Sequence, residues 1–201
     1  MNEIFNQMMS LHRIEGADGE RNALYEVMQQ IVLCGLYRGG FFNEAAFYGG
    51  TCLRIFYGLK RYSEDMDFSL LTKNPDFSLE KYFPAIIEEA RLLGRDIVIT
   101  KKDKKNFLRV ESAFLKDNTD VYNLTFATDK TLKIKIEVDI DPPLGFKTEQ
   151  KLLMLPFSFN TRCMVPSDLY AGKMHALVFR QWKNRIKGRD WYDFEWYVRN
   201  R

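Results

Sequence analysis

Asp65 and Asp67 are the residues of this sequence best suited to hold a metal ion. They stand at the start of the strand expected over "MDFSLL", and side chains two positions apart on a strand leave the same face, about 6.5 Å apart. Two carboxylates held so close repel each other unless a cation lies between them. Carboxylate oxygens select hard ions, so the pair predicts a site for Mg²⁺ or Mn²⁺ that serves phosphoryl transfer. The alternative is an acidic strand edge exposed to solvent.

A glycine pair directly precedes a short apolar helix, which we expect over "CLRIFYGL". Gly49 and Gly50 let a bulky anion approach the backbone closely, because neither has a Cβ atom. Thr51 can cap the helix, whose first N–H groups and dipole favour an anion. The pattern predicts a phosphate-binding turn, with an ordinary turn that binds nothing as the alternative.

A third carboxylate comes from "LKIKIEVDI", residues 132–140, where strict alternation predicts a strand with one apolar face. Glu137 and Asp139 both lie on its polar face. Either residue completes a metal site if this strand neighbours the strand that carries Asp65 and Asp67, and the sequence does not choose between them. The alternative is a strand whose alternating Lys and Glu side chains face solvent.

The last thirty residues of the chain carry eight basic side chains against three acidic ones, which suits phosphates. Lys173 and Arg180 are seven residues apart on an expected helix and therefore lie on one side of it. Together with Arg189 they are candidates to bind nucleotide phosphates or RNA. Asp190 and Asp193 share a face of the next helix. The alternative for the basic side chains is a solvated helix surface, and the alternative for the Arg-Asp pairs is a structural network of salt bridges between helices.

The composition is that of a globular protein. Its 201 residues are 46% hydrophobic and 28% charged, enough for one large domain or two small ones. The formal net charge is only +3, so the whole-molecule charge does not indicate nucleic-acid binding. No apolar run approaches the roughly 20 residues that span a bilayer, and the N-terminus lacks a signal-peptide pattern. Three widely spaced cysteines predict reduced thiols and a cytoplasmic location.

The order of the elements predicts an α+β protein with a mixed sheet and a helical C-terminal part. Helical periodicity extends over residues 19–38, and the short strand "EAAFYGG" follows. Beyond the strand-rich middle, a loop leads to Pro166, and we expect a hinge between the two parts at 156–166. The later expected elements are a helix over 79–93, strands in "DIVITKK", "FLRVESAFL", "VYNLTFAT" and "LKIKIEVDI", and helices over 167–183 and 190–199.

Four blocks in this order resemble one family. "GGTCLRIFYGLKRYSEDMDF" is similar to the first motif of the AbiEii/AbiGii-type nucleotidyltransferases, which are toxins of bacterial toxin–antitoxin and abortive-infection systems within the DNA polymerase β-like superfamily. "KIKIEVDIDPP" resembles the family's next strand motif. "VPSDLYAGKMHALVFR" and "KGRDWYDFEWYV" are similar to its Lys-containing helix and its Arg-Asp-x-x-Asp ending. The resemblance extends from Phe47 to Val198.

The resemblance implies an α+β nucleotidyltransferase-like domain over residues 1–155, with a mixed sheet flanked by helices. It also implies a helical part over 156–201 that completes the cleft for nucleotide and acceptor. Relatives transfer a nucleotide from an NTP to an acceptor, in several cases the 3′ end of tRNA. The implied partners are therefore an NTP, an RNA acceptor and a cognate antitoxin protein, with no membrane.

The resemblance also implies roles for single residues. The metal ligands would be Asp65, Asp67 and either Glu137 or Asp139. The nucleotide phosphates would contact the glycine turn, a serine and a lysine: Gly49, Gly50, Thr51, Ser63 and Lys173. Asp190 or Asp193 would occupy the acidic position of the C-terminal block.

Two other functions fit parts of the pattern. A non-catalytic module of the same fold would bind nucleotide or RNA without forming a product, but it has no need of the complete carboxylate set. A metal-dependent nuclease also uses Asp and Glu clusters, but it gives no reason for the glycine turn and would shorten RNA rather than extend it.

Overall fold

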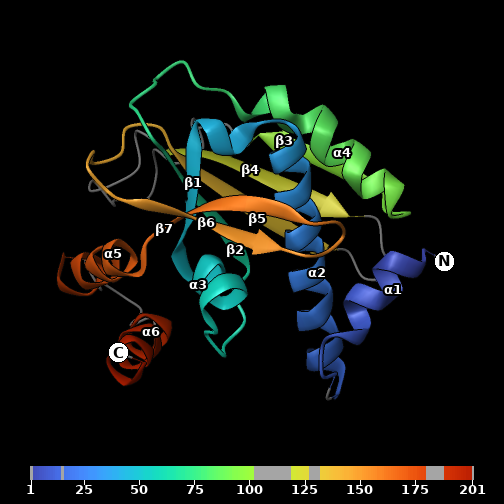
Figure 1. Cartoon of the computed structure of the whole chain (residues 1–201), viewed down its shortest axis with the longest axis horizontal. Helices are drawn as coiled ribbons and strands as arrows, with labels where there is room; N and C mark the ends of the chain where they lie inside the picture. The colour runs from blue at the N-terminus through green and yellow to red at the C-terminus, as the bar shows by residue number, and fades with distance from the viewer. Residues whose placement is uncertain (1, 15, 102–118, 127–131, 180–187, 201) are drawn as a thin grey trace, which may run out of the picture.

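The computed structural model describes residues 2–14, 16–101, 119–126, 132–179 and 188–200 (Figure 1). These residues form a seven-stranded mixed sheet flanked by six α-helices, so the α+β prediction is confirmed. The expected strand "FLRVESAFL" lies outside the described residues. The helices are α1 (Glu3–Ser10), α2 (Gly16–Arg38), α3 (Gly49–Tyr57), α4 (Phe83–Leu92), α5 (Pro166–Phe179) and α6 (Gly188–Arg199). The strands are β1 (Ala45–Tyr48), β2 (Asp65–Leu70), β3 (Ile97–Lys101), β4 (Thr119–Phe126), β5 (Leu132–Asp139), β6 (Thr148–Leu153) and β7 (Phe159–Met164).

The sheet has the order β3-β4-β5-β2-β1-β7-β6, which places β5, β2 and β1 at its centre. β2 pairs in parallel with β5 and antiparallel with β1. In β5 the apolar residues are buried and alternate with more exposed polar ones, as predicted. The central position of β2 therefore brings the strand that begins with two aspartates directly beside the strand that carries Glu137 and Asp139.

Helix α2 crosses one face of the sheet, and α4 lies beside it (Figure 1). Helix α1 lies near the N-terminal end of α2. Gly35 is needed where α2 meets α4, because a Cβ atom there would lie 2.6 Å from the Cα atom of Ile86. The helix predicted over 79–93 is divided into a 3₁₀ turn, Leu79–Tyr82, and α4. Helix α1 was not predicted; the Asn2 side chain caps it by accepting hydrogen bonds from the N–H groups of Ile4 and Phe5.

The loop expected before Pro166 contains an antiparallel hairpin, β6 and β7, so that expectation is wrong. β7 pairs in parallel with β1 and therefore belongs to the sheet, although it lies beyond residue 156. β6 is an edge strand, and its sequence "TEQKLL" has little of the apolar alternation that identifies a half-buried strand. Helix α5 begins at Pro166, a residue favoured in the first turn of a helix.

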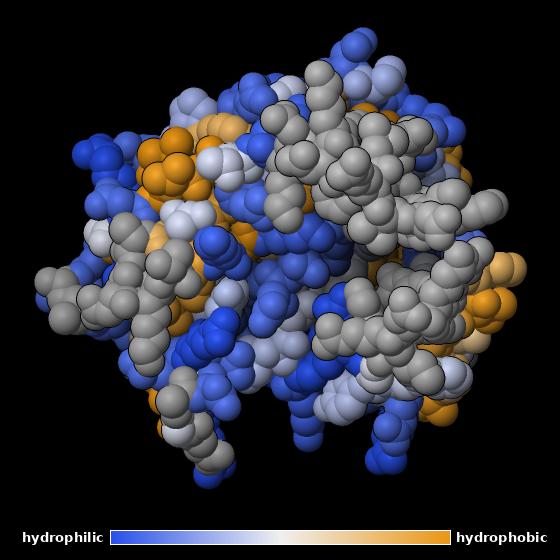
Figure 2. Space-filling model, turned by 180° about the vertical axis from the view of Figure 1, so that it is seen from behind, coloured by the Kyte–Doolittle hydropathy of each residue, from blue (hydrophilic) through white to orange (hydrophobic). Residues whose placement is uncertain are grey.

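Figure 2 shows the molecule from behind, where hydrophilic residues occupy the centre of the face. Within the described residues, no helix combines the length and the apolar character that crossing a membrane requires. All three cysteines, Cys34, Cys52 and Cys163, are free and buried.

Candidate active site

The glycine turn joins the end of β1 to the start of α3. Gly49 has φ +82°, a left-handed conformation that favours glycine, and a Cβ atom there would overlap the carboxylate of Asp67. Thr51 does not cap α3, contrary to the prediction: the N-cap is Tyr48, which makes no capping hydrogen bond through its side chain. The buried Thr51 hydroxyl instead donates to the carbonyl oxygen of Asp65 and ties α3 to β2. The first N–H groups of α3 therefore have no capping side chain.

The parallel register of β2 and β5 decides which carboxylates meet. Asp67 lies beside Glu137, and Asp65 lies beside Lys135. Asp139 lies beside Ser69, two positions further along the strand, and its carboxylate accepts the N–H of Asp141 at 3.1 Å. Of the two candidates left open by the sequence, Glu137 is therefore the one next to the aspartate pair.

The pKa of Asp67 shows how crowded this cluster is. Burial raises it to about 7, with further contributions from the negative charges of Glu137 and Asp65. Lys135 and Lys173 act in the opposite direction and lower it. A carboxylate with a raised pKa beside two others is a position where a cation is favoured.

Lys135 places a positive charge of the protein itself beside these carboxylates. Its ammonium group forms an ion pair with Glu137, and both side chains are partly exposed. The pKa of Lys135 is raised: burial acts to lower it, but the hydrogen bond to Glu137 and the charges of Asp65 and Asp67 outweigh burial. The ammonium group thus offsets part of the repulsion among the three carboxylates.

Helices α5 and α6 bring a second charged group to the site. Lys173 Nζ lies 3.0 Å from Asp190 Oδ1 and 2.8 Å from Asp193 Oδ2. Both aspartates are buried, and Asp193 also accepts two hydrogen bonds from Arg61, each of 2.6 Å. The two predicted C-terminal acidic residues are therefore partners of buried salt bridges. They hold Lys173 near enough to Asp67 for its positive charge to lower the pKa of Asp67.

The other predicted residues differ in their placement. Ser63 comes close to Gly50, since a Cβ atom on that glycine would lie 2.9 Å from the Ser63 hydroxyl oxygen. Arg189 is exposed at the start of α6. Arg180 lies outside the described residues.

Three residues near the site were not predicted. Arg61 stands inside the first motif, where its position between the glycine turn and Asp65 was a usable signal. Lys135 precedes Glu137 by two positions, so the strand alternation already placed the two on one face. Gln29 had no such signal: it is buried in α2, and its amide donates to the carbonyl oxygens of Ser63 at 2.9 Å and Glu64 at 3.2 Å. These two hydrogen bonds hold the segment that leads into β2 against α2.

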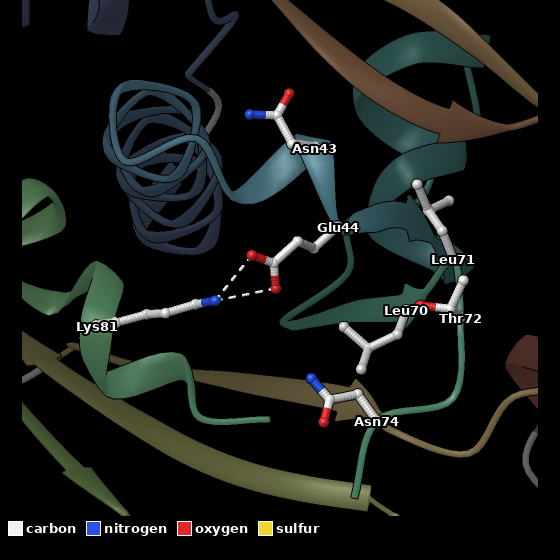
Figure 3. Close-up of a pocket in the computed structure, with 7 residues that line it drawn as sticks. All are labelled: Asn43, Glu44, Leu70, Leu71, Thr72, Asn74 and Lys81. Atoms are coloured by element: carbon white, nitrogen blue, oxygen red, sulfur yellow. Dashed lines mark hydrogen bonds and ion pairs between the residues drawn. The ribbon is translucent and has the colours of Figure 1, made fainter. Parts of the chain in front are cut away.

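A hollow at the opposite end of β1 and β2 is separate from this site (Figure 3). It has a volume of about 470 Å³ and is lined in part by Glu44, Leu70 and Asn74. Lys81 Nζ lies 2.8 Å and 2.9 Å from the two carboxylate oxygens of Glu44, so the charges that line the hollow neutralise each other.

Comparisons with known proteins place the chain in a family and identify its fold. Residues 31–201 match the family model described as nucleotidyl transferase AbiEii toxin, type IV TA system. The chain belongs to the AbiEii nucleotidyltransferase toxin family. The family match covers the glycine turn, the three carboxylates and the charged group of α5 and α6. No curated protein sequence gives a significant match.

Two solved structures have the same fold as this AbiEii-family chain. JHP933 from Helicobacter pylori matches with a TM-score of 0.61 and 19% identity, over 90% of this chain and 67% of that one. MenT4, a nucleotidyltransferase toxin from Mycobacterium tuberculosis, matches with a TM-score of 0.64 and 20% identity, over 97% of this chain and 64% of that one. The chain thus spans about two thirds of the length of each.

The donor set of the AbiEii site suits a hard divalent cation. Asp65, Asp67 and Glu137 offer only carboxylate oxygens, the ligands that Mg²⁺ and Mn²⁺ prefer. In the described part of the chain, no three His, Cys, Asp or Glu side chains stand close enough together to hold a metal as they are. The ion pair with Lys135 occupies Glu137, so a metal held by these three carboxylates would compete with the Lys135 ammonium group.

Proposed function

We propose that this chain is a divalent-metal-dependent nucleotidyltransferase that moves a nucleotide from an NTP to a hydroxyl group of an RNA, with the 3′ end of tRNA as the leading acceptor. The observation that carries the proposal is the register of β2 and β5. It sets Asp67 beside Glu137 at the end of the sheet where Gly49 and the N-terminus of α3 lie. The carboxylates and the glycine turn are thereby neighbours, which supports a phosphate held between them.

Asp65, Asp67 and Glu137 would hold Mg²⁺ or Mn²⁺. When bound, such an ion would offset the negative charge on the α-phosphate of the transferred nucleotide and on the leaving pyrophosphate. The raised pKa of Asp67 supports this assignment, because a site with excess negative charge favours a cation. One of these carboxylates would also take the proton of the attacking hydroxyl.

The chain's own donors would orient the triphosphate. The N–H groups at the start of α3 have no capping side chain, and Ser63 and Lys173 add a hydroxyl and a positive charge. Fixed donors of this kind stabilise charge at the reacting phosphate without reorganising during the reaction. Thr51 contributes its backbone only, since its side chain is buried against β2.

Membership of a toxin family supports two further parts of the proposal. An antitoxin protein encoded alongside would neutralise the activity, and transfer to tRNA would stop translation. The free cysteines accord with action in the cytoplasm, where both tRNA and NTPs are available.

The test is incubation of the purified protein with Mg²⁺ or Mn²⁺, each α-³²P-labelled NTP in turn, and total tRNA together with other cellular RNA. We expect label on RNA from at least one nucleotide, lost on chelation and in Asp67→Asn. Asp76→Asn is the matched control, because Asp76 is an exposed aspartate on the loop after β2. It should transfer as well as the wild type.

Other outcomes replace the proposal with a specific alternative. Shortened RNA that depends on Asp67 would indicate a nuclease. Nucleotide binding with no labelled product on any RNA would indicate a non-catalytic binding module. Equal transfer by wild type and Asp67→Asn would refute the assigned role of the carboxylates.

A further inference from the structure

Arg61 lies directly against the glycine turn. A Cβ atom on Gly50 would stand 2.8 Å from Arg61 Nη2 and 2.9 Å from the Ser63 hydroxyl oxygen. Because Gly50 has no Cβ atom, the guanidinium group can lie over the first turn of α3 at this short distance. One residue earlier, a Cβ atom on Gly49 would overlap the Asp67 carboxylate, so this carboxylate also lies against the turn. A chain of phosphates that starts at the carboxylates and passes over Gly50 would reach Arg61 next.

One buried carboxylate holds Arg61 and Lys173 together. Arg61 Nε and Nη2 donate to the two oxygens of Asp193 at 2.6 Å each, which is the bidentate geometry that fixes a guanidinium in one orientation. Lys173 Nζ lies 2.8 Å from the same carboxylate. The Asp193 side chain is fully buried, whereas those of Arg61 and Lys173 keep 18% and 15% of their surface exposed. The anion is inside, and the two cations lie between it and solvent.

Both cations keep N–H groups for which the described residues provide no acceptor. Arg61 has five N–H groups, of which three donate to Asp193 and to the carbonyl oxygen of Tyr62. Lys173 has three, of which two are directed at Asp190 and Asp193. The remaining donors are available to an anion that meets the exposed sides of the two residues.

We propose that Asp193 is a positioning residue that holds Arg61 and Lys173 as a two-cation clamp for the β- and γ-phosphates of the NTP. The inference rests on the proposed function and assigns one part of the nucleotide to one group of residues. It also gives Asp193 a role other than metal ligand, because its two oxygens are already taken by the cations.

The test compares a nucleoside triphosphate with the monophosphate of the same base, since only the first carries β- and γ-phosphates. Calorimetry in Mg²⁺ measures the affinity of wild type, Arg61→Gln and Arg61→Lys for α,β-methylene analogues of the four NTPs and for the matching NMPs. We expect Arg61→Gln to weaken binding of the triphosphate analogue about 10- to 100-fold, the range for a hydrogen bond to a charged group. NMP affinity should change less than twofold, and Arg61→Lys should be intermediate.

Arg54→Gln is the matched control. Arg54 is also partly buried, with 20% of its side chain exposed, and forms a comparable ion pair, with Glu26 at 2.7 Å. Its side chain donates to the carbonyl oxygens of Leu59 and Lys60 and is not among the atoms nearest to a Cβ atom on Gly50, so its loss should change the triphosphate and monophosphate affinities to the same extent. A general weakening of α3 would affect both arginine variants alike.

Asp193→Asn separates the positioning role from metal ligation. We expect it to weaken binding of the triphosphate analogue while Mn²⁺ affinity, measured by electron paramagnetic resonance without nucleotide, stays within twofold. A large loss of Mn²⁺ affinity would overturn the positioning role. Equal losses for triphosphate and monophosphate in Arg61→Gln, or no loss for either, would overturn the clamp. If wild type binds none of the triphosphate analogues, the proposed function itself fails.

Discussion

Replacing Asp67 with Asn should stabilise the metal-free protein at neutral and alkaline pH. Burial and the charges of Glu137 and Asp65 raise the pKa of Asp67 to about 7. In an unfolded chain the pKa of an aspartate is about 3.9. A carboxyl group with a raised pKa in the folded state contributes stability below about pH 4, and that contribution is lost as the pH rises through 7. Asn carries no charge and does not suffer this loss.

The size of the effect follows from the pKa itself. Each pKa unit is worth about 1.4 kcal/mol, so a rise from about 3.9 to about 7 corresponds to at most about 4 kcal/mol. The free energy of unfolding should therefore be equal in wild type and Asp67→Asn near pH 4. Between pH 4 and pH 7 the free energy of unfolding of the variant should rise progressively above that of wild type. At pH 8 the variant should remain more stable than wild type by up to about 4 kcal/mol.

Urea unfolding at several pH values in the presence of a chelator measures this difference. Asp76→Asn, at an exposed position, should differ from wild type by less than about 0.5 kcal/mol at every pH. Adding Mg²⁺ should stabilise wild type, by about 2.7 kcal/mol at a hundred times its dissociation constant, and should stabilise Asp67→Asn much less. A variant that is less stable than wild type at pH 8, or a difference independent of pH, would refute the assignment of excess negative charge to this cluster.

Three further substitutions test other contacts of the fold and the site. Lys135→Met removes the ammonium group beside Glu137, so it should lower the melting temperature measured in chelator at pH 8. Millimolar Mg²⁺ should then raise the melting temperature of this variant more than that of wild type. An equal increase in both proteins would contradict this expectation. Gly49→Ala should lower the free energy of unfolding in urea by about 1–3 kcal/mol, because of its positive φ and the overlap with Asp67; transfer activity should fall with it. Gly35→Ala should lower the free energy of unfolding in urea by about 1–3 kcal/mol, because α2 and α4 must move apart to admit the Cβ atom. Its nucleotide affinity should be unchanged. A loss of nucleotide affinity in this variant would show that the packing of α2 against α4 also shapes the site.

Local patterns in the sequence were sufficient for several elements. The strict alternation in 132–140 predicted β5, since a half-buried strand requires that period. The periodicity of 19–38 predicted α2 to within three residues at its start. Of the missed hairpin, β6 lies at the edge of the sheet, and an edge strand can keep polar residues and shows little alternation. Strand β7 does alternate between buried and more exposed residues, but its buried positions include Thr161, so its apolar pattern is weak.

The sequence by itself determined the inventory of the candidate site: a glycine turn, two aspartates on one strand face, a third carboxylate on another strand and a basic C-terminal segment. Spacing along one element is enough for this, because strand and helix periods decide which side chains share a face. The sequence also carried the family resemblance, which the match over residues 31–201 confirmed.

Only the tertiary structure decided which of these residues meet. The choice of Glu137 over Asp139 depends on the pairing register of β2 with β5, and a shift of two residues would reverse it. Asp193 became the partner of Arg61 because α6 packs against the segment that leads into β2, 132 residues away in the chain. No local pattern encodes contacts across that separation. They arise from how the sheet and helices pack, and this packing assigns each charge its partner.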